Sequence, residues 1–215
     1  MTSSNSPQNS KMTLLDRTLI LSGIVAPFVL LFAILISGSL HPGYSHISQA
    51  VSELGAKGVQ FNAIINYVGL VPTGLLTLAF SIAMFRYRKR EPVILVSSYF
   101  VAIIGIGRLL AGFFPCDPNC IPIVSLSGRL HAISGFTALF AGALAPLVMA
   151  FGLRHRESRT LFHLSLFLGL AALVMFLALI SQLWPQYFGG IQRFILIMSY
   201  IWIIAIAVNM YTDNK

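Results

Sequence analysis

The stretch TLILSGIVAPFVLLFAILIS, residues 18–37, decides the fold class, because it is apolar throughout and carries no charged residue. A helix that crosses the hydrocarbon core of a bilayer needs about 20 such residues. Every backbone donor and acceptor must be bonded within the chain there, which favours helix. Comparable stretches follow at residues 62–85, 93–114, 131–153, 161–180 and 191–211. The sequence therefore predicts an all-α polytopic membrane protein, a bundle of six transmembrane helices.

The composition agrees with this prediction. The 215 residues are 57% hydrophobic and 9% charged, whereas soluble domains are roughly 25% charged. Six spans leave little chain for loops, so we expect one membrane domain over residues 17–212 and no soluble domain. Residues 1–16 begin with a Ser-, Asn- and Gln-rich segment without an apolar face, which predicts a disordered cytoplasmic tail.

Basic residues predict the orientation. The formal charge of +8 does not indicate nucleic-acid binding, because most Lys and Arg flank the spans instead of forming one patch. An excess of Lys and Arg marks cytoplasmic loops. We therefore expect a protein of the cell (inner) membrane with both termini in the cytoplasm and loops 38–61, 115–130 and 181–190 facing outward. The flanking residues are Lys11, Arg17, Arg86, Arg88, Lys89, Arg90, Arg154, Arg156, Arg159 and Lys215.

The first outward loop, HPGYSHISQAVSELGAKG at residues 41–58, holds several candidate site residues. Ser45 is a plausible helix N-cap and Gly55 a plausible stop. A short amphipathic helix between them would place His46, Gln49 and Glu53 on one face. Such a helix could seal the top of the bundle, or it could present His46 and Glu53 to a cavity. His41 and Tyr44 precede it in the same loop.

Polar residues inside the spans give the next candidates. Asn62 and Asn66 open the second span and could join helices by hydrogen bonds or contact a ligand. Arg108 lies in the third span, roughly two turns from its outward end, where a charge is costly. It needs an anionic partner, and Glu53 and Asp117 are the carboxylates on that side. Arg108 could pair with one of them, hold an acidic ligand through its guanidinium fork, or extend toward the interface.

Cys116 and Cys120 flank Asp117 in a Pro-constrained turn after the third span. On the outward side we expect a disulfide, which would brace Asp117, although two thiolate metal ligands are the alternative. His41, His46 and His131 are also predicted outward, beside Glu53 and Asp117. These groups could complete a divalent metal site or supply a general base. No metal signature such as HExxH supports a metal, so no cofactor is assigned.

Three segments resemble a prokaryotic family of six-span membrane proteins, the "domain of unknown function nine-nine-eight" family. They are YSHIS at residues 44–48 with Glu53-Leu54-Gly55, GFFPCD at residues 112–117, and GRLH at residues 128–131. The resemblance covers residues 19–209. Glu53 stands where many relatives are expected to have Asp. The family implies a six-helix bundle and no established activity.

Together these residues favour an outward polar cavity that binds an anionic lipid headgroup or another small anion, since the outward side carries a positive balance. Its candidate ligand-binding residues are His41, Tyr44, Asn62, Asn66, Arg108, Arg129, Gln192 and Arg193. A lipid-acting hydrolase or transferase is one version, with His46 or His131 as base and Glu53 or Asp117 as orienting partner. A small transporter and a non-catalytic structural or partner-binding protein are the alternatives.

Overall fold

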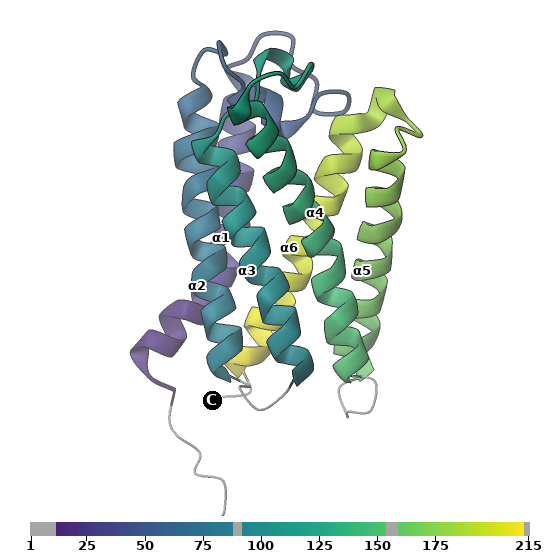
Figure 1. Ribbon diagram of the computed structural model, residues 1–215. Coiled ribbons are helices and arrows are strands. Elements are labelled where there is room, and N and C mark those ends of the chain that lie inside the picture. The colour runs from purple at the N-terminus through teal and green to yellow at the C-terminus, as the bar shows by residue number, and fades with distance from the viewer. Residues whose placement is uncertain (1–11, 88–91, 154–158, 213–215) are drawn as a thin grey trace, which may run out of the picture.

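The computed structural model describes residues 12–87, 92–153 and 159–212, and it contains six helices long and apolar enough to span a membrane (Figure 1). This confirms the all-α multi-pass prediction. The spans are α1 (Leu14–Ser39), η2 (Ile64–Leu70) continued by α2 (Val71–Tyr87), α3 (Pro92–Phe113), α4 (Leu126–Leu153), α5 (Arg159–Ile180) and α6 (Phe188–Thr212).

The helices run up and down as one bundle, so that α1 begins and α6 ends at the same end (Figure 1). We call this the termini end, and the opposite end, with the segments 40–63, 114–125 and 181–187, the loop end. Each helix packs against the next one along the chain, and α6 also contacts α1 and α4. The contact between α1 and α6 closes the ring.

Small residues set the close approach of the central helices. A Cβ added to Gly105 of α3 would lie 2.9 Å from the carbonyl oxygen of Gly74 in α2, and one added to Gly107 would lie 2.7 Å from the Ser134 carbonyl oxygen in α4. Transmembrane helices associate through such small-residue contacts, because lipid tails provide no hydrophobic drive between them. Arg108 therefore lies on a helix that is tightly packed on two sides.

Two helices, α1 and α4, begin at least four residues earlier than expected. Thr13 and Asp16 form a capping box, so α1 starts at Leu14 and residues 14–16 belong to its first turn, not to a tail. Residues 1–11 of the expected tail lie outside the described residues. So do several basic residues used for the orientation: Lys11, Arg88, Lys89, Arg90, Arg154, Arg156 and Lys215. Helix α4 starts at Leu126, so Arg129 and His131 lie in its first two turns.

The first loop contains less helix than expected. A 3₁₀ helix, η1, covers Val51–Gly55, and only a single turn forms between Ser45 and Gln49. A longer helix does not form, because the backbone groups that would bond to one another within it are bonded to side chains instead. Arg193 and Tyr44 both bond the Gln49 carbonyl oxygen, and the Ala50 N–H donates to Glu53.

Candidate functional site

Arg193 of α6 holds the first loop against the bundle. Its Nη1 donates to the carbonyl oxygens of His46 at 2.7 Å, Gln49 at 2.9 Å and Gly189 at 3.0 Å. Its Nη2 donates to the hydroxyl of Tyr44, which in turn donates to the Ala50 carbonyl oxygen at 2.7 Å. All these acceptors are neutral, so the guanidinium orders the loop without losing its positive charge to an ion pair.

The start of α6 is shaped to receive this loop. Gly189 lies so close to the Gln49 carbonyl that a Cβ there would collide with it. The Gly190 N–H donates to the Ile47 carbonyl oxygen at 2.7 Å, and the Val51 N–H donates to Gln192 Oε1 at 2.8 Å. Gln192, a predicted ligand-binding residue, is therefore engaged with the loop backbone.

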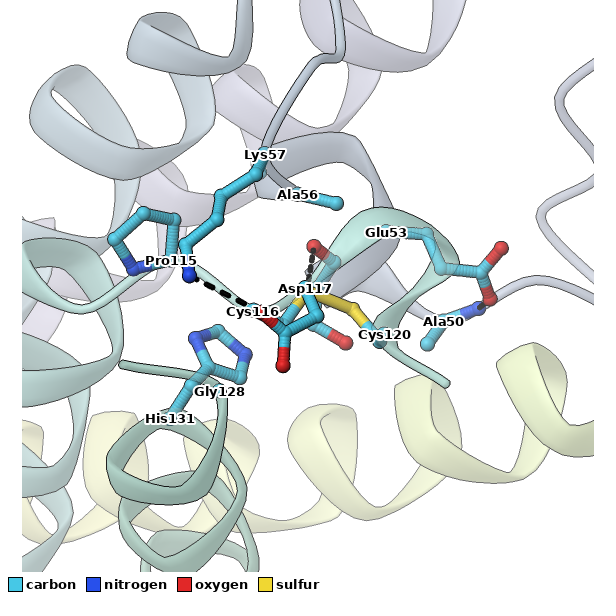
Figure 2. Close-up of a disulfide and its surroundings, with 12 residues drawn as sticks. Ala50, Glu53, Ala56, Lys57, Pro115, Cys116, Asp117, Cys120, Gly128 and His131 are labelled. Carbon is cyan, nitrogen blue, oxygen red and sulfur yellow. Dashed lines mark hydrogen bonds and ion pairs between the residues drawn. A yellow bond between two sulfur atoms is a disulfide. The ribbon is translucent and has the colours of Figure 1, made fainter. Parts of the chain in front are cut away.

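Asp117 is the centre of a second polar cluster at the loop end (Figure 2). Its carboxylate accepts hydrogen bonds from the backbone N–H groups of Val124 and Ser125, both at 2.9 Å, and pairs with Lys57 Nζ at 3.1 Å. The hydrogen bonds from Ser125, followed by those from Lys57 and Val124, hold the pKa of Asp117 well below its usual value. Gly128 leaves room for this carboxylate, since a Cβ there would collide with it.

A disulfide joins Cys116 to Cys120 beside Asp117 (Figure 2). The Lys57 N–H donates to the Cys116 carbonyl oxygen at 3.0 Å, so the disulfide turn packs on the first loop. The predicted disulfide is thus formed, and Asp117 is braced as expected.

Glu53 and His131 do not meet Asp117 as a catalytic set. Glu53 accepts from the Ala50 N–H at 2.7 Å and from Gln49 Nε2 at 3.0 Å, and Figure 2 shows it directed toward Ala50 and away from Asp117. His131 Nδ1 lies 3.1 Å from the carbonyl oxygen of Ala111 and 2.9 Å from that of Phe114. Both partners are acceptors, so Nδ1 carries the proton, and His131 caps the C-terminal end of α3.

The two asparagines of the second span also bind backbone. Asn62 Nδ2 donates to the Ala56 carbonyl oxygen at 3.1 Å, and Asn66 Nδ2 donates to that of Gly55 at 2.9 Å. Asn66 lies in η2, a π-helical segment that opens the span. Both amides therefore secure the first loop to this span.

The histidines of the first loop surround Tyr44. The ring centroids of His41 and His46 lie 5.8 Å and 5.1 Å from that of Tyr44, in edge-to-face geometry. Burial raises the pKa of Tyr44, while burial and the charge of Arg193 lower that of His46. Throughout residues 12–87, 92–153 and 159–212, no three His, Cys, Asp or Glu side chains lie close enough to hold a metal ion. His131 lies on α4, apart from this aromatic cluster.

The two remaining predicted arginines differ in burial. Arg129 is exposed at the start of α4, whereas Arg108 is only 8% exposed. The Nε of Arg108 is buried without a hydrogen-bond partner. Within the described residues the ion pairs join Lys57 to Asp117 and Arg86 to Asp16, so of the alternatives for Arg108 a pair with Glu53 or Asp117 is not formed. The carboxylate of Glu53 is instead bonded within its own loop.

A groove of about 390 Å³ lies between α1 and α6, on the loop-end half of the bundle. Its walls are apolar, and Arg193 and His46 line its loop end. The ring of His46 also packs on α1, because a Cβ on Gly38 would lie 2.6 Å from its Cε1. The other lining residues are Pro27, Phe28, Leu30, Leu31, Ile34 and Leu35 of α1 and Leu196, Ile197, Tyr200, Ile201 and Ile204 of α6.

The groove opens sideways, toward where lipid would lie. Leu31 and Leu35 on one wall and Ile197 and Ile201 on the other are each more than two-fifths exposed. Tyr200 lines the groove but is only 7% exposed, and its hydroxyl is buried without a hydrogen-bond partner. The groove thus combines a long apolar wall, one unused hydroxyl and a cationic end.

A family model described as "Protein of unknown function (DUF998)" matches residues 24–209. The chain belongs to the DUF998 family. The match covers all six spans at least in part and confirms the resemblance found in the sequence. No curated protein and no solved structure matches the chain. Membership of the DUF998 family therefore fixes no activity, and function has to be inferred from the geometry.

Sequence reasoning identified Arg193 and His46 but missed the apolar groove and Tyr200. The lining positions of α6 follow a spacing of three and four residues, as on any helical face. A face turned to lipid and a face that lines a groove have the same composition, so this spacing alone does not distinguish them. Recognising the groove requires the position of α1 relative to α6.

Proposed function

We propose that this DUF998 protein binds an anionic membrane lipid, with one acyl chain in the α1–α6 groove and the headgroup beside Arg193 and His46. The observation that carries the proposal is an apolar, laterally open groove whose loop end is closed by a guanidinium. A lipid has the matching arrangement, an apolar chain attached to a charged head. The pocket volume lies within the roughly 300–1,000 Å³ of small-molecule sites.

The length of the groove suits one leaflet. From Arg193 to Ile204 the lining of α6 advances eleven residues, which is about 16 Å at about 1.5 Å per residue. Half of a hydrocarbon core is about 15 Å. An acyl chain extending from a headgroup at Arg193 would therefore end near the middle of the bilayer.

Charge favours an anionic headgroup. Lys57 is neutralised by Asp117, and Glu53 keeps its charge but directs its carboxylate to Gln49 and the Ala50 N–H instead of pairing with Arg193. Arg193 bonds only neutral acceptors among the described residues, and its Nε is buried without a partner. A phosphate group would supply a negative charge to pair with Arg193, and a guanidinium matches the geometry of phosphate well.

The basic flanking residues support an orientation with the loop end outward. Most of the 14 Lys and Arg residues adjoin the termini end in the sequence, which is typical of the cytoplasmic side. The lipid would accordingly belong to the outer leaflet of the cell membrane.

A catalytic role draws less support from the geometry. Across the described residues no histidine is hydrogen-bonded to a carboxylate: His131 bonds carbonyl oxygens, and Asp117 and Glu53 bond other groups. A general base usually needs such an orienting partner. We therefore propose binding as the function and assign no reaction to His46, Glu53, Asp117 or His131.

Native mass spectrometry of detergent-purified protein tests the proposal. The parent should retain one anionic phospholipid. Ile201→Trp fills the groove and should lose that lipid at least several-fold. The control is Val174→Trp, because Val174 is a lipid-facing residue of α5 with 59% exposure outside the groove. Equal lipid retention in both variants would refute the proposal. A parent dimer that Ile201→Trp abolishes would instead show that a second copy covers the groove.

A further inference from the structure

Arg108 is a buried cation with no ion-pair partner among the residues that the structure describes. It lies in α3, five residues before the helix ends at Phe113, and is 8% exposed. Its Nε has no hydrogen-bond partner. A guanidinium at this depth is costly unless an anion or other acceptor accompanies it.

Among the acidic residues that the structure describes, none fills this role. On the loop end, the carboxylates of Asp117 and Glu53 are both bonded elsewhere. Asp16 pairs with Arg86 at 3.0 Å near the termini end. The other acidic residues in the sequence, Glu91, Glu157 and Asp213, lie outside the described residues. Helix α3 begins at Pro92 at the termini end, sixteen residues before Arg108, which corresponds to about 24 Å along the helix.

The surroundings of Arg108 lie inside the bundle. Gly105 and Gly112 on its own helix pack against α2 and η2, and Gly107 packs against α4. On α4, His131 bonds the carbonyl oxygen of Ala111, which follows Arg108 by three residues on α3 and so lies on the same side of that helix. Since Nδ1 of His131 caps α3, its Nε2 is the nitrogen left for another partner. Arg108 and His131 thus bring nitrogen groups to the same interior region.

We propose that Arg108 binds a small oxyanion, a phosphate or carboxylate group, inside the bundle beside His131. A planar guanidinium bonds two oxygens of such a group at once, which an ammonium does not do. The site is separate from the lipid groove, because Arg108 is not among the groove residues and α3 contributes none of them. The inference is therefore independent of the proposed lipid-binding function.

Thermal unfolding in detergent at constant ionic strength tests the inference. Sodium phosphate or acetate, compared with sodium chloride, should raise the Tm of the parent by about 2–4 °C. Arg108→Gln removes the charge and should abolish the rise. Arg108→Lys keeps the charge but loses the fork, and should reduce it. Arg129→Gln, which alters an exposed arginine at the same end, should respond like the parent.

The source of the oxyanion is tested in a parallel arm. Micelles doped with phosphatidic acid replace the soluble salts, and the same variants are compared. If the Tm rises in an Arg108-dependent way only with the soluble anions, the oxyanion is a free ion. If it does so only with phosphatidic acid, the oxyanion is a lipid headgroup. If neither arm shows a rise that requires Arg108, the inference fails. If Arg108→Gln does not fold, the comparison of Arg108→Lys with the parent decides in the same way.

Discussion

The guanidinium carbon of Arg193 lies 5.6 Å from the centroid of the Tyr44 ring, and its Nη2 also donates to the Tyr44 hydroxyl. One arginine therefore contacts a loop tyrosine 149 positions away both over its ring and at its polar end. The same guanidinium bonds the backbone of His46, which lines the groove beside it. Fixing the first loop and shaping the cationic end of the groove thus depend on one side chain.

Arg193→Lys should destabilise the protein although it keeps the charge. A lysine ammonium cannot reach three carbonyl oxygens and a hydroxyl in the geometry of the planar fork. Hydrogen bonds to charged groups are worth about 1.5–3 kcal/mol each. Losing at least one of them should cost about 2 kcal/mol or more, measured by unfolding in detergent. Arg129→Lys is the matched control, and an equal effect of both substitutions would contradict the role assigned to Arg193.

Asp117 should make the stability of the protein fall in acid. Its pKa in the folded protein is lowered from 3.8, so the ionised carboxylate favours the folded state. This contribution to stability is complete above the pKa that Asp117 has in the unfolded chain. It is lost as the pH falls from that value toward the lower pKa of Asp117 in the folded protein. The Tm should therefore drop below about pH 4. Asp117→Asn should lower the Tm at pH 7 and flatten the acid drop; an unchanged pH profile would contradict this assignment.

The Cys116–Cys120 disulfide should be present in protein purified without reductant. Mass spectrometry of the peptide containing both residues should show the loss of two protons, and alkylation should fail until the protein is reduced. Reduction should also loosen Asp117, because the disulfide turn and the first loop are joined through Lys57 and Cys116. Two freely alkylated thiols under non-reducing conditions would contradict the assignment.

Reporter fusions should place both termini in the cytoplasm. A fusion at Lys215 should report the cytoplasm and one near Asn119, on the disulfide turn, the exterior. The even number of spans puts the described helix ends Leu14 and Thr212 at one end of the bundle. An external signal at Lys215 would reverse the orientation and move the proposed lipid to the inner leaflet.

The spans were predictable because each is a property of a continuous stretch of sequence. Long apolar runs fix the helices, and the Pro-constrained Cys-Asp-Cys turn suggested its disulfide from local spacing. The helix starts were less accurate. The capping box at Thr13 and the start of α4 at Leu126 lie outside the strongly apolar runs, so hydropathy alone placed both boundaries too late.

Partners that are distant in the sequence were not predictable. Glu53 was one possible partner of Arg108, but its carboxylate accepts from the Ala50 N–H, three residues away. His131 was considered as a base, yet it caps a helix whose carbonyls are seventeen and twenty residues away. For Arg193 the sequence predicts a ligand contact, whereas its Nη1 bonds the backbone of the first loop. In each case the identity of the residue indicated a polar role, but its partner depended on the folded geometry of the loops and helices.

Photo-crosslinking tests the central claim, a lipid in the α1–α6 groove, most directly. The probe is a phosphatidylglycerol carrying a diazirine on one acyl chain, incorporated in nanodiscs with the purified protein. We predict adducts concentrated in residues 27–35 and 196–204, which Ile201→Trp reduces several-fold and Val174→Trp leaves unchanged. Adducts spread evenly over the exposed faces of all six helices, with the same yield in both variants, would contradict the claim.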